Sequence, residues 1–582
     1  SRWFHFPLPL SNLNAQTLPC FATMKQPETT IFEGAMADIT VYTARKIHTM
    51  EPSQPDGTAI AVRDGTILEV GSLESLKPWL DRYSHHVDTS FADKIILPGF
   101  IDPHLHPSMA SVILPMQFIT ALEWKLPWGT SPAIGSRAAY LESLASFAST
   151  PDDRPFFTWG YHRDWHGEIT RNDIDAICPD RPVVIWHRSF HEVIMNSAAL
   201  ARFELETDAI SNHPQIDLET GKFFETGLRL AIAALNPILM SPEHFGLGMA
   251  RLKQVAHFGG HTLVGDMGIG IFNFDVEWQA ACASLDNADT PFRVHYTPNI
   301  LALTPSGDFE ETRAYIETLP SLNTDRLFFS DHVKLFTDGA FFSQLMMVGP
   351  PGYLDGHEGE WLMVPENFEA AARLFWHAGY KIHVHCTGDL GLELALDVLE
   401  RLQFEKPRVN HRFTIEHLGL STPDQIRRMK DLGALASVNI YYLHELSDIY
   451  AREAIGTARA HTMARVGTLS RFSIPFALHS DYTMAPAQPL NSAWVAVNRQ
   501  NVTGAVVGPE ERISIDQALR AITIDAAYVL GLEHEIGSLQ PGKRADFTVL
   551  EEDPYDVPPT HLRDIEIWGT VFGGVPAPLD KN

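Results

Sequence analysis

Short apolar runs recur through the middle of the chain, and stretches with helical periodicity separate them. Eight of these runs have the length of strands buried on both faces. They are residues 95–104, 261–266, 292–297, 332–336, 381–386, 412–417, 434–439 and 475–480. Strands that alternate with helices are typical of βα units in a parallel sheet. Eight units are the number that a (β/α)8 TIM-like barrel requires, so we expect this α/β fold.

The two ends of the chain carry a different pattern, which is rich in β-strand signals. The strand-like runs there are residues 39–42, 59–62, 67–70, 545–550 and 565–571. The Asp64-Gly65 dipeptide between two of them is a hairpin signal. We therefore expect one small β-sandwich domain built from residues 37–97 and 537–582.

The barrel, residues 98–536, must also hold an insertion after its first strand. Residues from about 107 to 250 are too many for a single crossover, and strand-like runs around 156–161 and 182–187 fall among them. Residues 1–36 contain several prolines and no uninterrupted hydrophobic signal core. We expect them to be an extension, either disordered or the remnant of a targeting signal.

Charge and cysteine content restrict the partners. The 582 residues include 72 acidic and 44 basic ones, for a net charge of −28, which argues against nucleic acid or an anionic membrane as the partner. No apolar run approaches the length of a membrane span. The four cysteines are scattered without a CxxC pair, so we expect a reducing, cytoplasmic location. The expected partner is a small-molecule substrate, with a homodimer as one option for the oligomeric state.

Side chains that bind metals stand at the ends of several predicted strands. His104 and His106 close the first run, and residues at i and i+2 of a strand point to the same side. Later strands end near four more candidates, which are Lys334, His385, His417 and Asp481. The carboxyl ends of barrel strands meet at one mouth, where such barrels carry out their chemistry. The sequence therefore predicts a metal centre drawn from five strands.

These motifs resemble those of the amidohydrolase superfamily and, within it, the YtcJ-like (amidohydrolase family 3) metal-dependent hydrolases. The likeness extends from about residue 37 to residue 575. It rests on residues 98–106, Lys334 with Asp338-Gly339, residues 385–389, 415–417, Ser480-Asp481 and 541–546. A further likeness lies in residues 174–183, followed by His191 and residues 196–200.

The resemblance implies a distorted barrel that holds one or two divalent ions, usually zinc. His104 and His106 would bind the more buried ion together with Asp481. His385 and His417 would bind the second ion. Nitrogen and oxygen ligands without thiolate suit Zn, Mn, Fe or Co, so the residues alone do not choose the metal.

Lys334 would bridge the two ions if CO2 carboxylates its amine, because an ammonium group has no lone pair to offer. An unmodified Lys334 would leave a one-metal site. The alternative is an ordinary lysine paired with Asp338 or another carboxylate.

The ligand types suggest hydrolysis by a metal-activated water. Asp481 would accept the proton of that water and later deliver it to the leaving nitrogen. The leading hypothesis is cleavage of an amide-type C–N bond, in an N-acyl or N-formyl compound. A deaminase of the same barrel type is the second, but such enzymes carry Glu three residues after the strand-five histidine, where this chain has Gly388. A non-catalytic scaffold is the third, and it should lack the ligands.

Aromatic and histidine clusters in the insertion are suited to line a substrate pocket. The candidates are Trp159, His162, Trp165, His191 and Glu225. The resemblance places a histidine that faces the site at His191, which we expect to act in catalysis beside Asp481. Burial in the core is the rival interpretation for the tryptophans. His383 is the alternative to His385 as a ligand, and His479 either packs in the barrel or contacts substrate.

Overall fold

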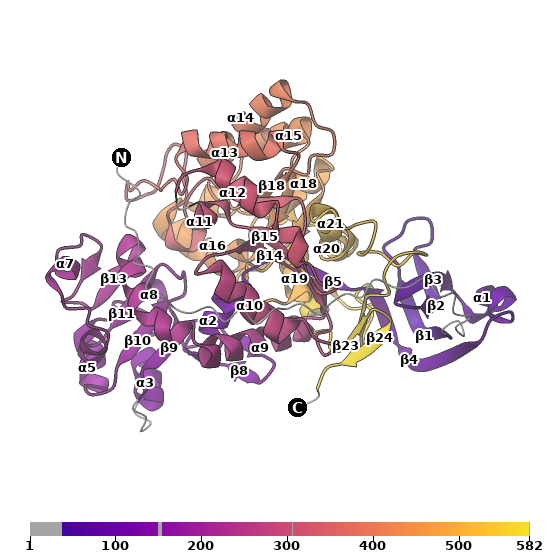
Figure 1. Ribbon diagram of the computed structural model, residues 1–582, viewed down its shortest axis with the longest axis horizontal. Coiled ribbons are helices and arrows are strands. Elements are labelled where there is room, and N and C mark those ends of the chain that lie inside the picture. The colour runs from indigo at the N-terminus through magenta and orange to yellow at the C-terminus, as the bar shows by residue number, and fades with distance from the viewer. Residues whose placement is uncertain (1–37, 149–153, 305, 581–582) are drawn as a thin grey trace.

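Two parallel sheets form the middle of the molecule in a computed structural model that describes residues 38–148, 154–304 and 306–580 (Figure 1). The predicted extension over residues 1–36 lies outside the described residues. The four-stranded sheet has the order β16 (Leu327–Phe329), β15 (Arg293–Pro298), β14 (His261–Ile269) and β5 (Phe100–Leu105). The five-stranded sheet has the order β17 (His332–Phe336), β18 (Lys381–Cys386), β19 (Thr414–His417), β20 (Leu435–Val438) and β21 (Phe476–Leu478). Each of the eight predicted runs overlaps one of these strands, and β16 was not predicted.

The first predicted run needs a correction at its start. Residues 95–98 end the long strand β4 (His85–Pro98), and β5 begins only at Phe100. A Cβ atom on Gly99 would lie 1.9 Å from Thr262 Oγ1. The chain therefore crosses from one sheet to the next at a point where only glycine fits.

The two parallel sheets meet along two seams. On one side, Asn299 and Lys334 form an isolated parallel bridge between β15 and β17. On the other side, the Asp481 amide donates to the carbonyl of His104 at 3.0 Å, and the His106 amide donates to Tyr482 at 2.9 Å. These bonds bring the carboxyl end of β21 against the carboxyl end of β5.

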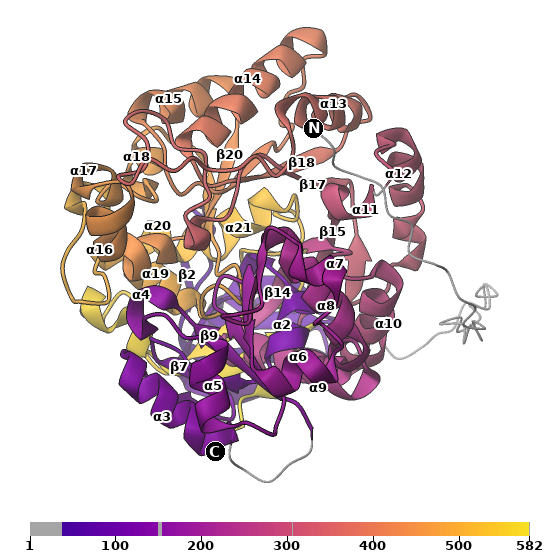
Figure 2. The same ribbon diagram turned by 90° about the vertical axis from the view of Figure 1, so that its left-hand side faces the viewer.

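Amphipathic helices cover the outer side of the parallel strands. Helices α13 (Pro365–His377), α14 (Asp389–Glu405) and α15 (Pro423–Leu432) follow one another along the outside of the five-stranded sheet (Figure 2). In α14, Leu392, Leu396 and Leu399 are buried at helical spacing, so one stripe of the helix faces the sheet. No helix within the described ranges is long and apolar enough to span a membrane.

Both ends of the chain enter a single seven-stranded sheet. Its order is β24 (Val575–Pro578), β23 (Ile567–Phe572), β22 (Phe547–Leu550), β4, β1 (Ile39–His48), β2 (Asp56–Arg63) and β3 (Thr66–Gly71). The link between the ends is the antiparallel pair β4–β22, in which Pro98 lies opposite Phe547. This strand pairing describes one sheet. The predicted β-sandwich domain and its boundaries, residues 37–97 and 537–582, stay predictions.

The long insertion has a sheet of its own. The six strands are β12 (Ile216–Asp217), β13 (Lys222–Phe224), β11 (Glu192–Met195), β10 (Val183–His187), β9 (Phe156–Tyr161) and β6 (Gln117–Phe118), in that order. Strands β9 and β10 confirm the runs predicted around 156–161 and 182–187. The insertion lies at the opposite end of the molecule from strands β1–β3 (Figure 1).

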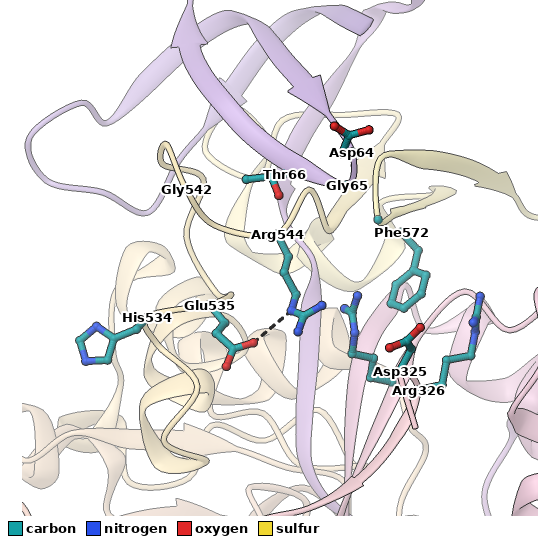
Figure 3. A pocket seen from close by; sticks show the side chains of 12 residues that line it. Asp64, Gly65, Thr66, Asp325, Arg326, His534, Glu535, Gly542, Arg544 and Phe572 are labelled. Carbon is teal, nitrogen blue, oxygen red and sulfur yellow. Dashed lines mark hydrogen bonds and ion pairs between the residues drawn. The ribbon is translucent and has the colours of Figure 1, made fainter. Parts of the chain in front are cut away.

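A polar cavity of about 540 Å³ lies between the seven-stranded sheet and the start of β15 (Figure 3). Arg293 forms an ion pair with Asp546, and its guanidinium lies 4.3 Å from the centre of the Phe572 ring. Arg544 donates to Glu535 at 3.1 Å. The Arg293–Asp546 ion pair thus lies at the joint between the parallel strands and the seven-stranded sheet.

Candidate metal centre

Side chains from two strand ends, those of β5 and β19, surround the carboxylate of Asp481, which itself follows β21. The Nε2 atoms of His104 and His106 lie 3.6 Å and 3.2 Å from its Oδ1 atom. Nδ1 of His417 lies 3.6 Å from Oδ2. Ligands that hold zinc tetrahedrally at 2.0–2.1 Å stand about 3.3 Å from one another. The spacing of His104, His106 and Asp481 is therefore that of a metal ligand set, and His417 adjoins it.

The backbone at the strand ends turns sharply to present these groups. His417 and Asp481 adopt positive φ angles of 70° and 53°, a region that costs a residue other than glycine about 1–2 kcal/mol. Asp102 secures the second turn, because its carboxylate accepts hydrogen bonds from the Ser480 hydroxyl at 2.5 Å and the His104 amide at 3.2 Å. Strain at this point is a common property of functional sites.

Lys334 and His385, the other two predicted ligands, lie beside this group. The His385 ring is 4.4 Å from the His417 ring. Lys334 is 1% exposed, and no hydrogen bond to its Nζ atom exists in the described part of the chain. Burial lowers the pKa of Lys334 to about 8, although the charges of Glu416 and Asp481 act in the opposite direction.

Asp338, the alternative partner of Lys334, is engaged elsewhere. Its carboxylate accepts hydrogen bonds from the amides of Met347, Thr387 and Gly388 at 2.7–3.0 Å. Asp338 therefore holds the loop that follows β18.

His479 joins the group more closely than the sequence indicated. Its ring lies 4.4 Å from the ring of His104 and 5.2 Å from that of His417. One ring nitrogen from each of these three histidines lies within 4.8 Å of the others. The usable signal was its position two residues before Asp481, which places both side chains on one side of the strand end.

The donor atoms fit a divalent ion. Within the described ranges, the buried nitrogens without a hydrogen-bond partner include His104 Nε2, His385 Nε2, Lys334 Nζ and both ring nitrogens of His417 and His479. Leaving such groups unpaired is costly. Burial lowers the pKa of His104, His385 and His417, so these rings stay neutral and keep the lone pair that a metal needs.

Aromatic side chains of the insertion lie next to this group. The Trp159 ring packs 5.2 Å from Trp124, which in turn lies 6.0 Å from Tyr482, the neighbour of Asp481. Trp165 packs against a core cluster that contains Tyr442, whose ring is 6.4 Å from that of His417. Trp159 is thus a fully buried core residue that reaches the candidate ligands only through Trp124 and Tyr482, and Trp165 packs at the edge of the cluster.

The remaining insertion candidates are His162, His191 and Glu225. His162 is buried between Trp165 and His187, with ring centres 4.6 Å and 4.8 Å away. The His191 amide donates to Ser189 just before β11. Glu225 begins helix α8 (Glu225–Leu239), and its side chain lies outside the described part of the structure.

A buried ion pair that sequence reasoning missed joins the insertion to the segment that follows β20. Arg188 and Glu445 are almost fully buried and paired, and Arg188 also donates to the carbonyl of Met484 at 2.9 Å. Met484 follows Asp481 by three residues. No spacing along the sequence links positions 257 residues apart, so only the fold reveals the pair.

Comparison with known proteins agrees with this geometry. The sequence model of the amidohydrolase family matches residues 92–578. Protein LONG AFTER FAR-RED 3 of Arabidopsis thaliana is 26% identical over 551 residues, covering 90% of this chain and 88% of its own length. N-substituted formamide deformylase of Arthrobacter pascens is 23% identical over 570 residues, covering 93% and 98%. The putative amidohydrolase YtcJ of Bacillus subtilis is 25% identical over 557 residues, covering 91% and 97%.

A solved structure shares the fold. The crystal structure of an uncharacterised metal-dependent hydrolase from Pyrococcus horikoshii superposes with a TM-score of 0.70 at 22% identity, covering 90% of this chain and 99% of that one.

Proposed function

The chain belongs to the amidohydrolase family, and from this premise we propose that it hydrolyses an amide-type C–N bond with a metal-activated water. The observation that carries the proposal is the convergence of His104, His106 and His417 on Asp481. The relatives named as an amidohydrolase and as a formamide deformylase support this bond type. An N-acyl or N-formyl compound is the proposed substrate class. On the same premise, the two parallel sheets constitute the distorted (β/α)8 barrel.

The proposed ligands of the buried ion are His104, His106 and Asp481, with His417 and His385 completing the centre. The triads His104–His106–Asp481 and His104–His417–His479 share His104. Its Nδ1 atom is already bonded to Glu416, so Nε2 can serve only one of the triads at a time. One ion at the shared position is therefore the simplest occupancy, and zinc is the proposed metal.

A second ion requires a carboxylated Lys334. A pKa of about 8 leaves a useful fraction of neutral amine near neutral pH, and only the neutral amine can add to CO2. The new N–C bond forms as the nitrogen loses one proton, and the resulting carbamate oxygens can bind metal.

A divalent ion held by these residues would supply a water with a pKa lowered to about 7 and would polarise the substrate carbonyl. Asp481 accepts the proton of the attacking water at its carboxylate and returns it to the leaving nitrogen. Burial alone would raise the pKa of Asp481, but the hydrogen bond and charge of His106 outweigh it and keep the pKa low. Asp481 is therefore ionised and ready to act as the base.

The side chains around the mouth have separate proposed roles. Trp159, Trp165 and His162 restrict water and contact the substrate, as dry pockets strengthen electrostatic interactions. His191 is proposed to orient the substrate carbonyl, and Glu225 to contact the substrate.

The test combines elemental analysis with assays on a panel of N-substituted formamides and N-acyl amines. Asp481→Asn should retain its fold and lose about 10²–10⁴-fold in activity, the usual contribution of a positioned acid–base group. Asp553→Asn is the matched control, because Asp553 is a buried aspartate bonded to His48 in the seven-stranded sheet. Protein that binds no divalent ion after incubation with zinc, or a fully active Asp481→Asn variant, would overturn the proposal. Release of ammonia instead of an amine would favour the deaminase.

A further inference from the structure

A line of buried polar side chains leads from the metal centre into the barrel. The Glu416 carboxylate lies between two histidines, with Oε2 2.6 Å from Nδ1 of His104 and Oε1 2.6 Å from Nδ1 of His383. Nε2 of His383 lies 2.8 Å from Nδ1 of His332. All four side chains are fully buried. Four residues from strands β5, β19, β18 and β17 thus form one hydrogen-bonded chain.

The position of Glu416 determines where the protons lie. Each of its two carboxylate oxygens lies 2.6 Å from one histidine Nδ1 atom, so the carboxylate bridges two ring nitrogens that can donate. An ionised carboxylate can only accept hydrogen bonds. Both Nδ1 atoms must therefore carry hydrogen. In the neutral His104 ring, Nε2 is then left with its lone pair, and this is the atom that faces Asp481.

The packing of His332 holds the far end of the chain. The rings of His332 and His383 are stacked with centres 5.0 Å apart and an angle of 25°. Within the barrel, His383 stands two residues before His385 on β18, so both point to the interior. One proton is shared in the hydrogen bond between His383 Nε2 and His332 Nδ1. This hydrogen bond fixes the orientation of the His383 ring.

We propose that Glu416 is a positioning residue that fixes the tautomer and orientation of His104, and that His383 and His332 hold Glu416 in place from the barrel interior. The part that concerns metal binding rests on the proposed function. The tautomer does not, because it is a property of the metal-free protein.

The alternative is a set of buried polar groups that merely satisfy one another. A buried network with every partner present is rigid, whereas removal of one partner leaves costly unpaired groups. Both interpretations predict some loss of stability on mutation. Only the positioning role predicts that zinc affinity falls in a variant that keeps its fold.

The main variant is Glu416→Gln, which keeps the size and gives one acceptor oxygen and one NH2 donor. One of the two histidines must then change its tautomer or turn its ring. We expect zinc affinity to fall by about 10–100-fold, as for other groups that orient a metal-bound histidine. Competition with a chelator of known affinity measures it.

Ser330→Ala is the matched control. The Ser330 hydroxyl bonds His295 Nε2 at 2.7 Å, and the His295 ring lies 4.8 Å from His332 without a hydrogen bond between them in the described part of the chain. This variant disturbs a neighbouring buried histidine outside the line, so zinc affinity should stay unchanged.

The spectroscopic readout uses metal-free protein labelled with 15N-histidine, with His104 identified by the resonance lost in His104→Gln. Wild-type protein should show His104 protonated at Nδ1. Protonation at Nε2 in the wild type would overturn the proposal, whatever the protein binds. Unchanged zinc affinity in folded Glu416→Gln would also overturn it.

His332→Gln covers the case in which Glu416→Gln does not fold. It removes the last ring of the line without touching the metal centre. We expect a smaller fall in zinc affinity, about tenfold at most, and a changed His383 signal. If wild-type protein shows the expected tautomer but binds no zinc, the proposed function fails and the positioning of His104 stands.

Discussion

The two ends of the parallel strands differ in how their buried polar groups are arranged. At the strand starts, beside the seven-stranded sheet, Arg293 pairs with Asp546 and Arg544 with Glu535 (Figure 3), and the unpartnered nitrogens of the described residues, such as His261 Nε2, are scattered. At the strand ends, several buried histidine nitrogens and Lys334 Nζ have no hydrogen-bond partner in the described residues.

A buried polar group without a partner costs free energy, so a cluster of them indicates a ligand that would supply the partners. Ion pairs such as Arg293 with Asp546 satisfy one another and give no such indication. We therefore look for the chemistry at the strand ends and not at the joint.

The largest effect is expected when one buried histidine is changed at each end of the strands. His104 ends β5, whereas His261 begins the neighbouring β14, and both are fully buried. His104→Gln should abolish zinc binding and reduce activity by more than the 10–100-fold typical of outer-shell changes. His261→Gln removes a bond to the Ala256 carbonyl and should lower only stability. The measurements are zinc content and activity per folded molecule of each variant. Equal losses in both variants would contradict the assignment of the metal centre to the strand ends.

Breaking a pair at the joint should cost stability and leave catalysis intact. Arg293→Leu leaves the buried Asp546 carboxylate without its ion-pair partner, and loss of one partner of a buried pair costs about 3–5 kcal/mol. Urea denaturation measures the change in the free energy of unfolding. A fall in kcat of the folded variant would show that the joint and the site are coupled.

Removing the metal tests the centre from the other direction. At a free zinc concentration 1,000 times its Kd, binding stabilises the folded state by about 4.1 kcal/mol. A chelator should remove this gain from the wild type and from Arg293→Leu alike. His104→Gln should show no gain, and a gain there would place zinc elsewhere.

Much of the fold follows from local patterns. Apolar runs bounded by polar residues fix where strands form, and β18, at residues 381–386, coincides with its predicted run. The break at Gly99 escaped prediction, because it depends on the close approach of Thr262. A tertiary contact of this kind leaves no periodic signal in the sequence.

The candidate site shows the same limit. His104, His106 and Asp481 follow from their positions after strands, since parallel strands end at one edge. His479 was left undecided, because the side chains it meets come from other strands. Glu416 was seen only as part of a motif, and its bonds to His104 and His383 join residues 312 and 33 positions apart.

The pH dependence of stability tests the burial of Lys334 at the strand ends. Burial lowers the pKa of Lys334 from 10.5 to about 8, so between these values the unfolded chain binds more protons than the folded one. Stability of the metal-free, CO2-free protein should therefore rise with pH from about 8 to about 10.5, because the cost of burying a charged Lys334 disappears over this range. Lys334→Met should lack that part of the rise. Parallel pH profiles for the two proteins would mean that Lys334 is not held in a low-dielectric site.

The smallest effect is expected at the exposed edge of the joint. Arg544 and Glu535 are both about half exposed, with side-chain exposures of 47% and 54%, and solvent screens such pairs to about 0–1 kcal/mol. Arg544→Ala should lower the free energy of unfolding by less than about 1 kcal/mol, with zinc affinity and kcat unchanged. This variant and Arg293→Leu both remove one arginine from the same cavity. The difference between their free energies of unfolding therefore measures the effect of burial at equal loss of charge. A loss as large as that of Arg293→Leu would mean that Arg544 bonds further groups across the joint, and that the cavity is less open to solvent than its exposed rim indicates.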